Sequence, residues 1–148
     1  MKLNEEPEYH PDILTKTAQE YFGINYLFPY QRIVISNIIE TAELIKPEGN
    51  ECRLENPKSD SINKQIVILP TGAGKSLCFM LPSVLLNGPT LVIFPLLSLI
   101  ADQLRRCREA GIEAVCLTGG QSKSEREKAF SGIMSREIKI VLTNPETA

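Results

Sequence analysis

The sequence has little net charge, no long apolar run and no closely spaced pair of cysteines. Its 148 residues carry 16 lysines and arginines against 18 aspartates and glutamates, and the resulting net charge of −2 excludes a histone-like polycation. No apolar run approaches the roughly 20 residues that a membrane-spanning helix needs, and the first residues lack the apolar block of a secretory signal. With 43% hydrophobic and 23% charged residues, the composition is that of one ordinary globular domain.

The four cysteines carry no metal signature, because none of them forms a CxxC pair. Cys78, Cys107 and Cys116 each lie in or beside an apolar pattern. We therefore expect no zinc site, and we interpret these cysteines as small buried hydrophobic residues in a reducing compartment. The expected location is cytoplasmic, in association with the nucleoid, or nuclear.

The first part of the chain, residues 1–45, predicts two helices. In the first, over 11–23, apolar residues recur at the spacing of one helical face, and a glycine ends the pattern. The second helix runs from Pro29 to Ile45, and a proline suits its first turn. The stretch 46–64 is highly charged and has no periodicity, which indicates a solvated loop or insertion.

From residue 65 to residue 148, short apolar runs alternate with helical patterns. The predicted strands are 66–69, 91–94, 114–117 and 138–142. The predicted helices end near Leu86, cover 96–110, and open at Ser124, where Ser124 and Glu127 have the spacing of a capping box. The apolar residues of that last helix are Phe130, Ile133 and Met134. This order predicts an α/β fold with a mostly parallel sheet and helices on both faces.

The clearest chemical signal is the segment Leu69–Ser76, which reads LPTGAGKS. It matches a phosphate-binding loop except that leucine stands in place of the first glycine. Gly72 and Gly74 allow successive backbone N–H groups to point at phosphate oxygens, and the following helix adds its dipole. Lys75 supplies a charge for the β- and γ-phosphates, and Ser76 supplies a hydroxyl for Mg²⁺.

Two weaker signals flank this loop. Gln31 stands at a helix start beside aromatic residues, where its amide suits an adenine edge, although such a glutamine is commonly an ordinary surface or core residue. The turns after the predicted strands, at 95–98, 118–122 and 143–146, are small and polar. Ligands bind at the carboxyl ends of parallel strands, and a helix start there suits a nucleic-acid phosphate, although a plain turn fits equally well.

Five blocks, in this order, resemble the RecQ family of DNA helicases, within helicase superfamily 2. The adenine-sensing block of that family is similar to YFGINYLFPYQ, and its phosphate loop and next helix are similar to LPTGAGKSLCFMLPSVLL. Its next three blocks resemble TLVIFPLLSLIADQ, EAVCLTGG and IVLTNPE. The resemblance implies a RecA-like, phosphate-loop NTPase fold, ATP and Mg²⁺ as cofactors, and 3′-to-5′ movement along single-stranded DNA that separates a duplex. It also implies a part in DNA repair and recombination.

The resemblance also assigns roles to residues. Gln31 would recognise adenine, and Phe28 would stack on it. The nucleotide would bind at Thr71, Gly72, Ala73, Gly74, Lys75, Ser76 and Leu77, with Lys75 catalytic and Ser76 facing the metal. The DNA track would hold Pro95, Leu96, Ser98, Gly119, Gly120, Thr143 and Pro145.

The chain departs from the family at several places. Phe28 and Tyr30 stand where the family usually has arginine and glycine, and Ala101 replaces a common lysine. The acidic box that binds Mg²⁺ and the second motor domain, with its arginine finger, are absent from the 148 residues. We therefore expect this chain alone to bind nucleotide weakly and to hydrolyse it poorly, and to need the remaining half of a longer helicase.

Two other classes of protein are weighed against a helicase. A different phosphate-loop protein, such as a nucleotide kinase or a GTPase, would carry an arginine-rich lid or an Asn-Lys-x-Asp motif, and neither is present. The third class is a non-enzymatic fragment that binds nucleic acid. Arg105, Arg106 and Arg108 cluster on one predicted helix, but Asp102 and Glu109 dilute them, which favours a solvated face of mixed charge.

Overall fold

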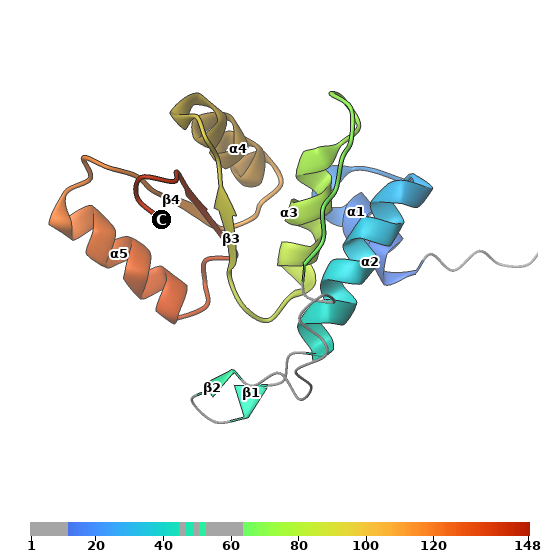
Figure 1. The fold of residues 1–148 in the computed structure, drawn as a ribbon, viewed down its shortest axis with the longest axis horizontal. Helices are drawn as coiled ribbons and strands as arrows, with labels where there is room; N and C mark the ends of the chain where they lie inside the picture. Colours follow the sequence, from blue (N-terminus) through green and yellow to red (C-terminus); the bar gives the residue numbers. More distant parts are fainter. Residues whose placement is uncertain (1–11, 45–46, 49–50, 53–63) are drawn as a thin grey trace, which may run out of the picture.

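The computed structural model describes residues 12–44, 47–48, 51–52 and 64–148 of the chain (Figure 1). The first half of the element order is α1 (Ile13–Phe22), α2 (Pro29–Leu44), β1 (Pro47–Glu48), β2 (Glu51–Cys52) and α3 (Lys75–Leu85). The second half is β3 (Thr90–Ile93), α4 (Leu97–Glu109), β4 (Ala114–Leu117), α5 (Lys123–Met134) and β5 (Ile140–Thr143). In this described part of the chain, no helix has both the length and the apolar character needed to cross a membrane.

The main sheet has three strands in the order β3-β5-β4, and every pair is parallel. β5 lies in the centre, and all four of its residues are buried, as expected for a strand with a neighbour at each edge. α4 connects β3 to β4, and α5 connects β4 to β5. The predicted α/β class with a parallel sheet and flanking helices is therefore confirmed.

Helix α3 joins two hydrophobic cores. Its Leu77 and Leu81 belong to the first core, whose other buried members come from α1, α2 and the segment between them: Leu14, Ala18, Leu27 and Ile35. Its Met80 belongs to the second core, between α3, α4 and the sheet, with Ile100, Cys107, Ile112, Ile140 and Leu142. A helix that is apolar on most sides is expected to lie between two layers, and α3 does so.

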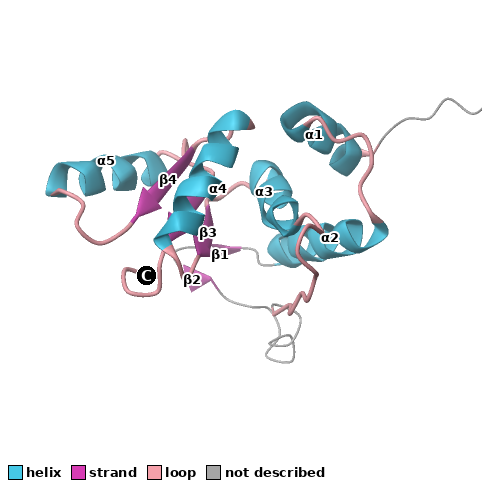
Figure 2. Ribbon diagram, turned by 90° about the horizontal axis from the view of Figure 1, so that it is seen from above, coloured by secondary structure: helices cyan, strands magenta, loops and turns pink. Residues whose placement is uncertain are grey.

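The two cores correspond to two groups of elements in Figure 2. α1, α2 and α3 lie together on one side, and the three-stranded sheet lies with α4 and α5 on the other. The boundaries of α1 and α2 agree with the sequence prediction, and Gly23, with a φ of 64°, ends α1 as expected.

The predicted strand over 66–69 is wrong. These residues pair with no strand among those described, and Ile66 and Ile68 are each 91% exposed. The preceding Gln65 is tied to α2, because the Asn37 side-chain amide donates to its Oε1 atom at 2.9 Å. An apolar run indicates that a segment favours burial, but it does not indicate which sheet edge is available to that segment.

The start of α5 is also shifted from the prediction. Ser122, not Ser124, is the N-cap, and its hydroxyl accepts a hydrogen bond from the Glu125 N–H at 3.3 Å. The Glu125 carboxylate accepts in turn from the Ser122 N–H at 2.8 Å, which completes a capping box. The pattern Ser-x-x-Glu occurs twice in overlapping registers, so its spacing alone did not identify the cap.

The apolar residues predicted to line α5 face solvent for the most part. Phe130 is 51% exposed and Met134 is 82% exposed, while Ile133 is half-buried. Ala129 is the buried residue of this helix. A small side chain therefore makes the close contact here, and the larger apolar residues do not mark the inward face.

The cysteine interpretation is confirmed for two of the described positions. Cys78 and Cys107 are buried, Cys116 is half-buried, and all three thiols are free. Burial raises the pKa of the Cys107 thiol to about 11, so it stays protonated at neutral pH. The described residues contain no group of three or more histidine, cysteine or acidic side chains placed to hold a metal ion.

The stretch 46–64 is described only at Lys64 and at β1 and β2, which form a short antiparallel pair. The rest of this expected loop, together with residues 1–11 and the Cys52 side chain, lies outside the described residues. The division of the chain into 1–45, 46–64 and 65–148 therefore stays a prediction.

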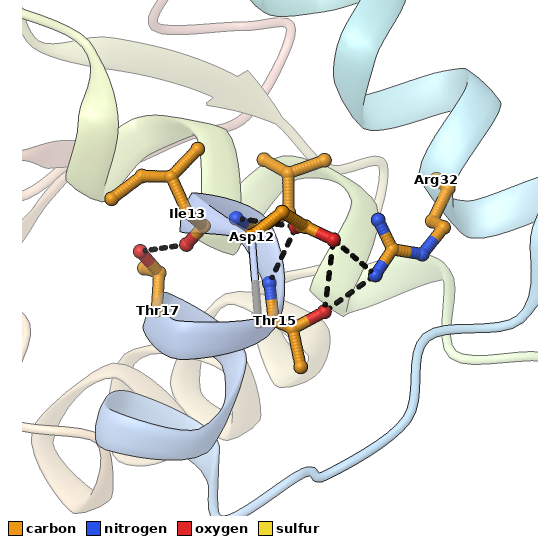
Figure 3. A network of polar contacts seen from close by, with 6 residues as sticks. Asp12, Ile13, Thr15, Thr17 and Arg32 are labelled. Atoms are coloured by element: carbon orange, nitrogen blue, oxygen red, sulfur yellow. Dashed lines mark hydrogen bonds and ion pairs between the residues drawn. The ribbon is translucent and has the colours of Figure 1, made fainter. Parts of the chain in front are cut away.

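The start of α1 is held by a polar network around Asp12 (Figure 3). The Asp12 carboxylate accepts from the N–H groups of Leu14 and Thr15 at 3.0 and 3.1 Å, as an N-cap does. It also pairs with Arg32 of α2 at 2.8 Å, and Arg32 bonds the Thr15 hydroxyl as well. The Arg32 side chain holds the pKa of Asp12 below its usual value of 3.8, with help from these backbone N–H groups.

We predict that Asp12→Asn lowers the free energy of unfolding at pH 7 and removes an acid-dependent part of it. Asparagine keeps the N-cap acceptor but loses the ion pair, which at an exposed site is worth up to about 1 kcal/mol. The folded carboxyl has the lower pKa, so its contribution is complete above 3.8 and is lost as the pH falls through the folded pKa. Urea unfolding of both proteins, at pH 7 and at steps below pH 4, measures this difference. A difference that stays constant over the whole range contradicts the prediction.

Candidate functional site

The loop Leu69–Ser76 bends sharply just before α3. Gly72 and Gly74 have φ angles of 84° and 74°, in the left-handed region that glycine adopts without steric cost. Gly74 is also the N-cap of α3, and no side chain caps this helix. The N–H groups at the start of α3 are therefore left for an anion, as the sequence predicts for a phosphate loop.

Lys75, the first residue of α3, folds back over this loop. Its Nζ atom donates to the carbonyl oxygens of Pro70 at 2.8 Å and of Leu69 at 3.1 Å. Ser76, half-buried, follows in the first turn of the helix. The loop thus holds its own cation in place, and phosphate oxygens can take over from the two carbonyls as acceptors.

Gln31 connects the aromatic block to the phosphate loop. The residue is 5% exposed, and its side-chain Oε1 accepts from the Phe28 N–H at 3.0 Å. Its Nε2 donates to the Ala73 carbonyl at 3.2 Å. A Cβ atom at Gly74 would lie 2.5 Å from this Nε2, so any larger residue there would push the Gln31 amide from its present position. The structure therefore brings together two signals that lie about 40 residues apart in the sequence.

Tyr30 makes a second link to the loop. Its hydroxyl donates to the same Ala73 carbonyl at 3.2 Å. Its ring stacks on that of Phe28, with centroids 5.5 Å apart and planes 4° apart, and the Tyr26 ring meets Phe28 edge-on at 5.6 Å. Sequence reasoning marked Tyr30 only as a departure from the family pattern. No local signal identifies its partner, because the hydrogen bond spans 43 positions.

A cavity of about 730 Å³ opens between this loop, the end of α1 and the end of α4. The predicted residues that line it are Gln31, Thr71, Gly72, Gly74, Lys75, Ser76 and Leu77. Ala73 contributes through its carbonyl contacts instead. Phe28 is 51% exposed and does not line the cavity, so its contact with a base stays a prediction. The volume is in the range of small-molecule sites.

The other residues that line the cavity were not predicted from the sequence. They are formed by Tyr21, Phe22, Ile24, Met80, Arg106, Glu109 and Ala110. Tyr21, Phe22 and Met80 belong to the apolar patterns of α1 and α3, while Ile24 follows α1 and Ala110 is the C-cap of α4. In the sequence these positions are indistinguishable from ordinary core positions. The charged members lie on α4, far from the loop in sequence.

The charges on α4 form a network, as the mixed-charge pattern predicts. Asp102 pairs with Arg105 at 2.6 Å and with Arg106 at 2.9 Å, and Arg105 also pairs with Glu109 at 2.8 Å. Hydrogen bonds from Arg105 and then Arg106 lower the pKa of the Asp102 carboxyl. The positive groups of this helix are thus partly neutralised by its own carboxylates.

The loops predicted to follow DNA gather at one edge of the sheet. Because β3, β4 and β5 are parallel, the segments after them leave from the same side. Pro95, Leu96 and Ser98 lie where β3 leads into α4, and Gly119 and Gly120 follow β4; all five are exposed.

Thr143 differs from the other predicted DNA contacts. It is 2% exposed, and its hydroxyl donates to the Leu117 carbonyl at 2.7 Å, which ties the ends of β5 and β4 together. Pro145, after β5, is exposed. In this structure the Thr143 hydroxyl holds the edge together, and a contact with DNA stays a prediction.

Comparison with known proteins identifies the family. The model of the DEAD/DEAH box helicase family matches residues 28–148. The chain is similar to the ATP-dependent DNA helicase RecQ of Synechocystis sp., with 40% identity over 82 residues, and to that of Bacillus subtilis, with 39% over 79 residues. It is also similar to the putative ATP-dependent DNA helicase Q1 of Caenorhabditis elegans, with 34% identity over 131 residues.

These alignments cover 55%, 53% and 88% of this chain respectively, but only 17%, 13% and 17% of the relatives. The chain therefore spans a small part of the length of the relatives that it matches. The resemblance to the RecQ family is confirmed, and the parallel sheet with its flanking helices is consistent with a partial RecA-like domain. The chain belongs to the DEAD/DEAH box helicase family, and its relatives are RecQ-type DNA helicases.

Proposed function

We propose that this chain is the nucleotide-binding part of an ATP-driven motor that moves 3′-to-5′ along single-stranded DNA and separates duplexes. The observation that carries the proposal is the bend at Gly72 and Gly74, which opens into the cavity and stands at an uncapped helix start. Backbone N–H groups, the helix dipole and Lys75 all favour an anion at this point. Relatives named as ATP-dependent DNA helicases support ATP as that anion.

The contacts of Gln31 support the proposal that it recognises the base. An amide side chain has two N–H donors and two lone pairs, and its contacts with Phe28 and Ala73 use one of each. One donor and one lone pair remain, which is the pair that an adenine edge requires. We propose that the existing contacts orient the amide, so that adenine recognition needs no rearrangement of the side chain.

Mg²⁺ is proposed to bind through the nucleotide rather than through a protein cage. Ser76 offers one hydroxyl in the first turn of α3, and the described residues hold no acidic cluster that could bind the ion by itself. Magnesium commonly keeps several waters and uses substrate phosphates as ligands, so this donor set fits it. When bound, the ion neutralises charge on the phosphates.

The exposed loops at the carboxyl edge of the sheet are the proposed path for DNA. Leu96 is the N-cap of α4 and offers no capping side chain, so the free N–H groups of this helix are available to a backbone phosphate.

Efficient hydrolysis requires a metal, an oriented water and a charge-stabilising arginine together. We propose that the 148 residues bind nucleotide but do not by themselves supply this complete set, and therefore turn it over slowly. A role in repair and recombination belongs to the same proposal.

Lys75→Ala is expected to abolish ATP binding, because the phosphates lose the only cation of the loop. Lys123→Ala is the matched control, since Lys123 is likewise the first residue of a helix and is exposed. Isothermal titration calorimetry with ATP and Mg²⁺ measures both variants. Unchanged affinity of Lys75→Ala would contradict the phosphate-loop proposal.

Gly74→Ala is expected to reduce the preference for ATP over GTP. The new Cβ would displace the Gln31 amide, which lies 2.5 Å from that position. Gly72→Ala is the control, because its backbone angle is equally strained but no atom lies within 4 Å of its Cβ position. Competition between the two nucleotides measures the preference, and an equal change in both variants would show that backbone strain alone acts here.

A further inference from the structure

The two neighbouring arginines of α4 use their guanidinium groups differently. Both terminal nitrogens of Arg105 donate to carboxylates: Nη1 donates to Glu109 at 2.8 Å and Nη2 donates to Asp102 at 2.6 Å. Arg106 donates to Asp102 through Nε at 2.9 Å. In the described part of the chain, no bond is formed by the two terminal nitrogens of Arg106, so the planar end of this side chain stays available to a ligand.

Arg106 is also the arginine of this helix that lines the cavity. The cavity wall includes Arg106 together with Lys75 and Gln31, whereas Arg105 and Arg108 are not part of it. One side of Arg106 is thus anchored by Asp102, and the residue lines the same cavity as the phosphate loop. An arginine held at Nε is oriented in advance, which reduces the entropy that a ligand contact costs.

The nearest negative group in the same wall is Glu109, which would repel a phosphate if it were unpaired. Its carboxylate accepts from Arg105, so its charge is offset within the helix. The network therefore separates two tasks. Arg105 pairs with both acidic residues, whereas Arg106 shares only Asp102 and keeps its two terminal donors.

We propose that Arg106 is a second cation of the nucleotide site and that its two terminal nitrogens bind phosphate oxygens of the nucleotide. The proposal rests on the function proposed above. A guanidinium offers two parallel N–H donors that match two oxygens of one phosphate, which a lysine at this place does not. Neither the composition of α4 nor its charge pattern distinguishes Arg106 from its neighbours; its place at the cavity and its open donors do.

The test is calorimetric titration of the full chain with ATP and, separately, with tripolyphosphate, which has no base or ribose. Arg106→Ala is expected to weaken binding of both ligands by about tenfold or more, the size typical of a hydrogen bond to a charged group. Arg106→Lys keeps the charge but loses the paired donors, and is expected to fall between Arg106→Ala and the unaltered chain. Arg108→Ala is the matched control: it removes the same charge two positions away, outside the cavity, and is expected to leave both affinities within about twofold.

The outcomes separate this inference from the proposed function. If Lys75→Ala abolishes binding but Arg106→Ala matches Arg108→Ala, the nucleotide site stands and the role of Arg106 is overturned. A loss for ATP without a loss for tripolyphosphate would also overturn it, because Arg106 would then contact the nucleoside. If the unaltered chain binds neither ligand, both proposals fail. Far-ultraviolet circular dichroism of each variant confirms that the fold is retained.

Discussion

The carbonyl oxygen of Ala73 accepts hydrogen bonds from both Gln31 and Tyr30, and this junction holds the phosphate loop against α2. Within the loop, Lys75 bonds the carbonyls of Leu69 and Pro70, but the loop is largely exposed and contains two glycines in the left-handed region. Glycine adds conformational freedom to the unfolded chain, so a loop of this kind needs contacts from outside to stay bent. The residues proposed to orient the base and the loop proposed to hold the phosphates are therefore one connected unit.

The same unit depends on the packing of α3. The helix begins at Lys75, and its apolar side chains enter both hydrophobic cores, so the start of the helix is fixed relative to α1, α2 and the sheet. Large-to-small changes in such cores typically cost about 2–5 kcal/mol, which is a large part of the stability of a small domain. The candidate site is thus supported by burial on two sides of α3, while its own surface stays open.

The sequence predicted most of the local structure and the position of the phosphate loop, because these depend on short-range rules. Pro29 at a first turn, Gly23 at a helix end and the Gly-Lys-Ser segment before α3 each specify backbone geometry within a few residues. The failures came where long-range pairing decides. The run at 66–69 looks like a buried strand but pairs with no described neighbour. The cap of α5 failed for a local reason, since two Ser-x-x-Glu patterns overlap and the prediction chose Ser124 where the cap is Ser122.

The composition of the site was harder to predict for the same reason. Tyr30 meets Ala73 across 43 positions, and Arg106 reaches the cavity only because α4 packs beside α3 through the second core. Thr143 also has a contact that its motif does not indicate, since its side chain is buried and bonded to the Leu117 carbonyl. Motifs identified the chemistry of the loop, whereas the walls around it follow from tertiary packing.

Nucleotide binding is proposed to depend on backbone N–H groups at the bend before α3, which donate hydrogen bonds to the phosphate oxygens. Its most direct measurement is a nuclear magnetic resonance titration of the ¹⁵N-labelled chain with a nonhydrolysable ATP analogue and Mg²⁺. The account predicts that the amide signals of Gly72, Gly74, Lys75 and Ser76 move most, because their N–H groups gain charged acceptors. Binding of the analogue with these four signals unmoved would contradict it.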